Sequence, residues 1–109
     1  MNYRKLGKSS IVVSEIGLGT AQLANTDGAS PGVKPISPET AREILLTALH
    51  EGVSFFDTAD QYGSAELLLG RLRGCSRNPF IATKAGLRPD GVRDFSEEYL
   101  RHQVARSIE

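Results

Sequence analysis

Residues 53–66 read VSFFDTADQYGSAE, and they decide the fold because an apolar run ends there in polar side chains. Residues 53–56 are apolar except for Ser54, which is typical of a strand covered on both faces in a parallel sheet packed by helices. Asp57 follows at the carboxyl end of that strand, and Tyr62 comes five residues later. Ligands bind at this end of the strands in parallel α/β proteins. The stretch therefore predicts a buried strand that leads into an active-site loop.

The composition limits the possible partners. A chain of 109 residues has room for one domain. Its 13 Lys and Arg balance its 13 Asp and Glu, so no charge excess points to nucleic acid or to an anionic membrane, and we expect a small-molecule partner. No apolar run reaches the roughly 18 residues of a membrane span, and the first residues lack a secretory signal. Cys75 is the only cysteine, so no intrachain disulfide can form, and we expect a cytoplasmic protein.

Short segments of alternating type surround the central stretch. Residues 2–6 and 11–13 flank a turn-rich spacer, which predicts a hairpin. The hairpin is followed by three predicted units of strand, loop and helix. The expected strands are 15–18, 53–57 and 80–84. The expected helices are 38–51, 64–72 and a last one that begins at 97 and is still continuing at Glu109. This alternation predicts a parallel sheet with right-handed crossovers.

The predicted helices and loops have recognisable boundaries. Ser37 caps the first helix with Pro38 at its first position, and Gly52 ends it. Ser96 caps the last helix in the same way. Residues 25–35 are polar and aperiodic, which predicts an exposed loop that could cover a site.

Two strand ends carry the strongest argument for chemistry. The predicted strands at 53–57 and 80–84 each end in a charged residue. If these strands are neighbours in register, Asp57 and Lys84 meet, because adjacent strands lie about 4.8 Å apart. Such an ion pair keeps Lys84 protonated. A cation near Tyr62 favours the phenolate and makes this phenol a usable proton donor near neutral pH.

Each of these residues also has an ordinary structural interpretation. Asp57 could be a loop or capping acid, Tyr62 a half-buried aromatic, and Lys84 a strand-end lysine that reaches solvent. The glycines at 17 and 19 allow the close approach either of a ligand or of another chain segment. No cluster of His, Cys and carboxylates has the spacing of a metal site. The combination of all three polar residues at matching strand ends favours the functional interpretation.

Together these residues resemble the aldo-keto reductase family. The matching segments are 17–20 (GLGT), 52–63 (GVSFFDTADQYG), Ala65-Glu66 with Leu69-Gly70, and 81–84 (IATK). The resemblance spans essentially the whole chain. It implies a (β/α)8 barrel closed at its bottom by the N-terminal hairpin, and NADPH-dependent carbonyl reduction without a metal.

The resemblance also implies roles for particular residues. It assigns Asp57, Tyr62 and Lys84 to three members of a catalytic tetrad, with Tyr62 as the proton donor. The fourth member is a histidine after the fourth strand, which residues 1–109 do not include. A full barrel takes about 250 residues. Residues 1–109 are therefore expected to be an incomplete barrel domain, truncated after the third βα unit.

The cofactor implied by the resemblance is NADP(H). Gly19, Thr20 and Ala21 match the loop that lies near the nicotinamide, and Asp57 touches the same end of the barrel. The family's main contacts to the cofactor phosphate and adenine come from later strands and helices, which this chain does not include.

The sequence therefore predicts the N-terminal fragment of an NADP-dependent reductase of small aldehydes, ketones or sugars, inactive by itself. The alternative is a catalytically silent barrel fragment that serves as a binding or regulatory module. An unrelated phosphate-binding barrel is disfavoured, because the phosphate loop of such barrels usually follows strands 7 and 8. Self-association through an exposed strand edge is also expected.

Overall fold

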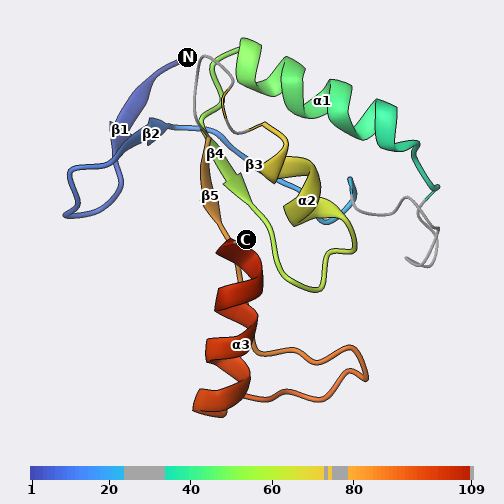
Figure 1. Cartoon of the computed structure of the whole chain (residues 1–109). Coiled ribbons are helices and arrows are strands. Elements are labelled where there is room, and N and C mark those ends of the chain that lie inside the picture. The colour runs from blue at the N-terminus through green and yellow to red at the C-terminus, as the bar shows by residue number, and fades with distance from the viewer. Residues whose placement is uncertain (24–33, 73, 75–78, 109) are drawn as a thin grey trace.

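A computed structural model describes residues 1–23, 34–72, 74 and 79–108, and it shows the predicted alternation of strands and helices (Figure 1). The strands are β1 (Tyr3–Lys5), β2 (Val12–Ser14), β3 (Gly17–Gly19), β4 (Phe55–Asp57) and β5 (Phe80–Ala82). The helices are α1 (Pro38–His50), α2 (Ala65–Gly70) and α3 (Glu97–Ile108). Most of the loop predicted at 25–35 lies outside the described residues, as does Cys75.

The strands form one hairpin and one parallel sheet. β1 and β2 pair antiparallel, with Tyr3 opposite Ser14. The parallel sheet has the order β3-β4-β5, so β4 lies in the middle. Gly19, Asp57 and Ala82 lie side by side at its carboxyl end. The α/β fold predicted from the sequence, a hairpin followed by a parallel sheet, is confirmed.

The middle strand is shorter than predicted at its amino end. β4 begins two residues later than the expected strand at 53–57 because the preceding amides have other partners. The Val53 amide donates to the Ala48 carbonyl at 2.9 Å, which continues the end of α1. The Ser54 amide donates to the Ser14 hydroxyl, also at 2.9 Å.

The outer strand β5 is shorter than predicted at its carboxyl end. The expected strand at 80–84 ends at Ala82, whose carbonyl accepts the Thr58 amide at 2.8 Å. Two residues further on, the Lys84 carbonyl accepts the Asp60 amide at 3.1 Å. The chain therefore stays tied to its neighbour as far as Lys84, although regular pairing has stopped.

The first helix begins where predicted and ends one residue earlier, at His50, and the second is shorter than predicted at both ends. The Ser37 hydroxyl accepts the Thr40 amide at 3.1 Å at the start of α1, and Gly52 takes a left-handed φ of 94° just beyond its end. α2 covers only part of the predicted helix at 64–72. Ser64 makes no side-chain capping bond there, unlike Ser37.

The core lies between these two helices and one face of the parallel sheet (Figure 1). Phe56 of β4 is fully buried at its centre. The other members of the cluster are Leu23, Ala41, Leu45, Leu49, Leu68, Leu69 and Leu72. α3 differs, because Val104 and Ile108 on its apolar side are 52% and 65% exposed. The described part of the chain does not cover that side of α3.

The hairpin is fixed to the amino end of the parallel strands. The Tyr3 hydroxyl donates to the Gly52 carbonyl at 2.9 Å, just before β4. The Ser14 amide donates to the Ser54 hydroxyl at 2.9 Å, and this bond is reciprocated. The carboxyl end of the sheet is therefore left open on the opposite side. Within the described ranges, no helix has both the length and the apolar character needed to span a bilayer.

Both outer strands of the sheet lack a partner on one side in the described part of the chain. Phe80 and Ile81 of β5 are 39% and 40% exposed along that edge. Because unpaired strand edges template association, we expect the 109-residue chain to elute ahead of the monomer volume in size-exclusion chromatography, increasingly so at higher concentration. The charged edge variant Ile81→Lys is the matched control and should shift the peak toward monomer. A monomer at every concentration would contradict this expectation.

Candidate active site

The structure brings the predicted charged pair together at the open end of the sheet. Asp57 ends β4, and Lys84 lies two residues beyond β5. Lys84 Nζ donates to Asp57 Oδ1 at 2.5 Å and to the Thr58 carbonyl at 2.8 Å. The expected contact between Asp57 and Lys84 is confirmed, but the expected register is wrong: Asp57 lies opposite Ala82, and Lys84 reaches it from two residues further along the chain. Their side chains are 46% and 52% exposed, so a ligand in solvent can reach the pair.

Tyr62 lies beside this pair. Lys84 Nζ is 5.2 Å from the centroid of the Tyr62 ring. A turn holds the tyrosine directly before α2, because its amide donates to the Ala59 carbonyl at 3.0 Å and its carbonyl accepts the Ala65 amide at 2.8 Å. An acid, a cation and a phenol thus share one site at the carboxyl end of the strands.

The cation of this site is stabilised by its neighbours. The pKa of Lys84 is raised above its ordinary value of 10.5, chiefly by the hydrogen bond to Asp57. The charge of Asp57 and the proximity of Tyr62 act in the same direction, while partial loss of water opposes them. Lys84 therefore carries a full positive charge beside the phenol at neutral pH.

The two glycines of β3 lie in different surroundings. A Cβ at Gly17 would lie 2.9 Å from the ring of Phe55, so this position is required for packing. A Cβ at Gly19 would meet nothing within 4 Å. Gly19 therefore leaves open surface next to Asp57, where a flat ring could approach the backbone. The packing interpretation is confirmed for Gly17, and the approach of a ligand at Gly19 stays a prediction.

The residues after Gly19 turn toward the carboxyl end of β4, where Asp57 lies. The Thr20 amide and hydroxyl both donate to the Asp57 carbonyl at 3.0 Å. Thr20 is only 1% exposed, so its hydroxyl serves to hold Asp57. Ala21 is half-buried beside it. Across the described ranges, no three His, Cys, Asp or Glu side chains lie close enough to hold a metal ion.

Sequence reasoning missed a second layer of polar contacts behind the pair. The Thr83 hydroxyl donates to Glu66 Oε1 at 2.6 Å, which links the residue before Lys84 to the first turn of α2. Burial raises the pKa of Asp60, and the nearby charge of Glu66 raises it further. The alternation of side chains along the predicted strand was a signal for the Thr83 contact, since it places Thr83 and Lys84 on opposite faces.

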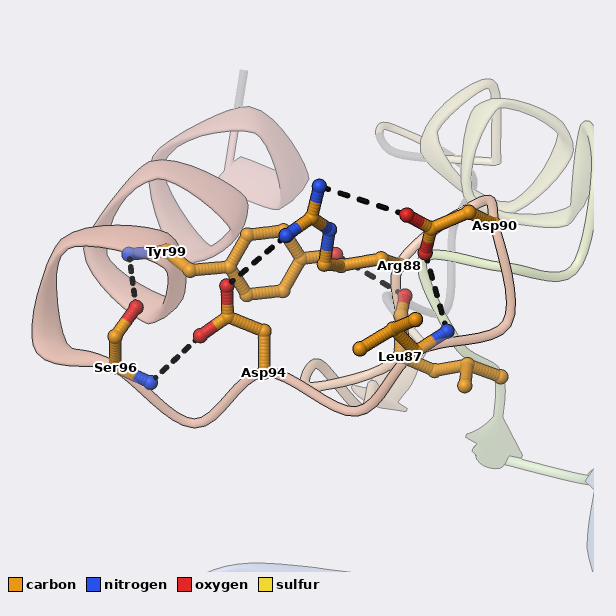
Figure 2. Close-up of polar contacts among 7 residues, drawn as sticks. Leu87, Arg88, Asp90, Asp94, Ser96 and Tyr99 are labelled. Carbon is orange, nitrogen blue, oxygen red and sulfur yellow. Dashed lines mark hydrogen bonds and ion pairs between the residues drawn. The ribbon is translucent and has the colours of Figure 1, made fainter.

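The segment after Lys84 folds back on itself, and Figure 2 shows its polar contacts. The Arg88 guanidinium lies 3.5 Å from Asp90 and 3.8 Å from Asp94. Asp94 accepts the Ser96 amide at 2.9 Å, which lowers the pKa of this carboxyl. The Tyr99 hydroxyl of α3 donates to the Leu87 carbonyl at 3.0 Å.

A backbone ladder accompanies these side-chain contacts. The Arg88 amide donates to the Val92 carbonyl at 2.8 Å, and the Asp94 amide donates to the Gly86 carbonyl at 2.9 Å. A Cβ at Gly86 would lie 2.4 Å from the Phe95 ring, so the ring packs directly against this glycine. The loop is therefore ordered by its own contacts and pinned to the start of α3.

The arrangement as a whole defines a class of protein. A hairpin at the amino end of parallel strands, with an acid, a cation and a phenol at the carboxyl end, forms the N-terminal part of a (β/α)8 barrel. The family model described as the aldo/keto reductase family matches residues 15–109. The chain belongs to the aldo/keto reductase family, and the resemblance noted in the sequence is confirmed.

Individual relatives agree with this assignment. The chain is 38% identical to the aldo-keto reductase str7 of Strobilurus tenacellus, covering 97% of this chain and 32% of that protein. It is 33% identical to the 6-dehydroglucose reductase of Novosphingobium aromaticivorans, over 97% of this chain and 36% of that protein. Its structure is similar to the holo form of an aldo-keto reductase from Bacillus halodurans, with a TM-score of 0.81, 32% identity, and coverage of 99% and 35%. The chain thus spans about a third of the curated relatives it matches.

Proposed function

We propose that residues 1–109 supply three of the catalytic residues of an NADP-dependent aldo-keto reductase, with Tyr62 as the proton donor to a carbonyl oxygen. The observation that carries the proposal is the position of the Lys84 ammonium group. It is hydrogen-bonded to Asp57 at 2.5 Å and lies 5.2 Å from the centre of the Tyr62 ring. A protonated amine held next to a phenol at a solvent-accessible strand end is an arrangement suited to general acid catalysis.

Each of the three side chains has a distinct task in this proposal. Asp57 accepts a hydrogen bond from Lys84 and keeps the amine protonated. The Lys84 charge stabilises the phenolate that forms when Tyr62 gives up its proton, which lowers the cost of that transfer. Tyr62 then recovers a proton from solvent, because the site is open at the end of the sheet. None of these three side chains needs a metal ion for its task.

The residues of the first parallel strand fit a nicotinamide cofactor. The open space at Gly19 leaves room for a flat ring, the half-buried Ala21 follows two residues later, and Thr20 holds Asp57 through its carbonyl. When bound, NADPH supplies the hydride that reduces the carbonyl carbon. The assignment of Gly19, Thr20, Ala21 and Asp57 to the cofactor site belongs to this proposal.

We further propose a small aldehyde, ketone or sugar as the substrate. The name of the Novosphingobium relative, a 6-dehydroglucose reductase, is that of an enzyme acting on a sugar carbonyl. The exposed carboxyl end of the sheet offers hydroxyl and carboxylate partners that suit a polar substrate. A chain that supplies only this wall of the site needs the remaining strands of a barrel for turnover.

A chimera tests the proposal directly. Residues 1–109 would replace the matching N-terminal part of the Bacillus halodurans reductase, which aligns with 99% of this chain. We expect the chimera to oxidise NADPH in the presence of a panel of aldehydes, ketones and sugars, and the 109-residue chain by itself to show no oxidation. The intact Bacillus protein serves as the positive control. A folded chimera that oxidises NADPH with none of these carbonyls would favour a silent binding or regulatory module instead.

A further inference from the structure

We infer that Glu66 is a positioning residue for Lys84 and acts through the hydroxyl of Thr83. The inference rests on the proposed function, because it concerns how the lysine beside Tyr62 is held in its working position. The side chains involved lie outside the trio of Asp57, Tyr62 and Lys84. Thr83 Oγ1 donates a hydrogen bond to Glu66 Oε1 at 2.6 Å, and this contact is the starting point.

The two faces of β5 explain why this bond matters for the lysine. Ala82 pairs with Asp57, and Ile81 pairs with the fully buried Phe56, which faces the helices. Successive side chains of an extended chain point to opposite faces. The next residue, Thr83, accordingly reaches the helix side, where it meets Glu66 of α2. Its neighbour must then point to the Asp57 side.

The chain at this point has lost its regular strand pairing. β5 ends at Ala82, and beyond it the Lys84 carbonyl accepts the Asp60 amide at 3.1 Å. This backbone bond and the Lys84 side-chain bonds to Asp57 and the Thr58 carbonyl hold the segment on the sheet side. The Thr83 side chain supplies a second attachment, on the helix side. A hydroxyl that donates to a carboxylate makes a short, charge-assisted bond, and this one lies at the protein surface.

Glu66 is itself well anchored. It follows Ala65, which is 1% exposed, and it precedes the fully buried Leu69 by one helical turn. The same carboxylate lies near the loop of Tyr62, because its charge raises the pKa of Asp60 in that loop. Glu66 therefore ties the lysine segment to α2. The Lys84 side chain is 52% exposed, so its position depends on its hydrogen bonds and on the placement of its backbone more than on packing.

The first experiment uses the chimera and four substitutions. Thr83→Val keeps the shape of the side chain and removes the hydroxyl, and we expect kcat to fall about 10- to 100-fold, since small misplacements of reacting groups have effects of that order. Glu66→Leu should give a similar loss. Thr83→Ser and Glu66→Gln retain a donor and an acceptor, and both should restore kcat to within about threefold.

The readouts separate positioning from general destabilisation. We expect the dissociation constant for NADPH to stay within about twofold in all four variants, so the loss falls on kcat alone. Equal kcat values for Thr83→Val and Thr83→Ser would overturn the inference. If instead the Tyr62→Phe chimera keeps full activity, the proposed function fails, whatever the Thr83 variants show.

The second experiment uses the 109-residue chain and needs no activity. Ammonium protons held in hydrogen bonds exchange slowly enough to give a ¹H–¹⁵N correlation near pH 6, and the chain has four lysines. We expect one such signal, assigned by its loss in Lys84→Arg, to persist in Thr83→Ser and to vanish in Thr83→Val. A signal that persists in Thr83→Val, or that is already missing from the unsubstituted chain, would count against the inference.

Discussion

Replacing Tyr62 by phenylalanine in the chimera is expected to lower the rate of carbonyl reduction by about 10²- to 10⁴-fold, the usual contribution of a general acid. The substitution keeps the ring, so the backbone bonds of this loop to Ala59 and Ala65 should persist. Only the proton donor beside Lys84 is lost. Steady-state rates with a carbonyl substrate at saturating NADPH measure the effect.

The control for the tyrosine variant is cofactor binding. Titration of NADPH by its fluorescence should give the same dissociation constant with and without the Tyr62 hydroxyl, because the proposed nicotinamide surface at Gly19 is untouched. A rate within about threefold of the unsubstituted chimera would remove Tyr62 from the role of general acid.

Replacing Lys84 by methionine is expected to abolish measurable carbonyl reduction while the chain stays folded. The variant removes the cation that lies 5.2 Å from the Tyr62 ring and leaves Asp57 without this donor. Phenolate formation then loses its main electrostatic support. The effect on stability should be small, about 0–1 kcal/mol, because both partners are near half-exposed.

The pKa of Lys84 fixes the sign of the accompanying pH dependence. The folded-state pKa of Lys84 is raised above 10.5. The ion pair therefore stabilises the fold wherever Asp57 is ionised and the pH is below 10.5. This contribution is lost as the pH rises through the raised pKa. Thermal unfolding of the unsubstituted chimera and of its Lys84→Met variant should therefore converge above pH 10.5. Lys84→Arg keeps the charge and is the matched control. Normal turnover in Lys84→Met would exclude the lysine from the mechanism.

The sequence predicted the order of elements better than their lengths. Ser37 and Gly52 mark the two ends of α1 through local chemistry, a side-chain cap and a left-handed turn, and both could be recognised in the sequence. The start of β4 could not, because the Ser54 amide bonds to Ser14, 40 residues away. Pairing over such distances depends on how the hairpin docks, which no local pattern specifies.

The candidate site was also predictable only in part from the sequence. The contact between Asp57 and Lys84 was predicted from matching strand ends, whereas the structure pairs Asp57 with Ala82 and Lys84 reaches back to Asp57 from beyond the end of β5. The Thr58 carbonyl that shares the Lys84 ammonium group was not foreseen, since a backbone acceptor has no signature in the sequence. The roles of these residues in binding and catalysis stay predictions until the variants are measured.

The ordered loop after Lys84 also has an evolutionary consequence. Its ion pairs, its backbone ladder and its bond from Tyr99 join residues between Gly86 and α3 to one another. Lys84, by contrast, is held by contacts from β4 and the Tyr62 loop. Mutations and insertions in this interval can thus accumulate without disturbing the lysine, and the whole loop can be exchanged for another. The chain separates a segment that can diversify from the candidate site residues that it borders.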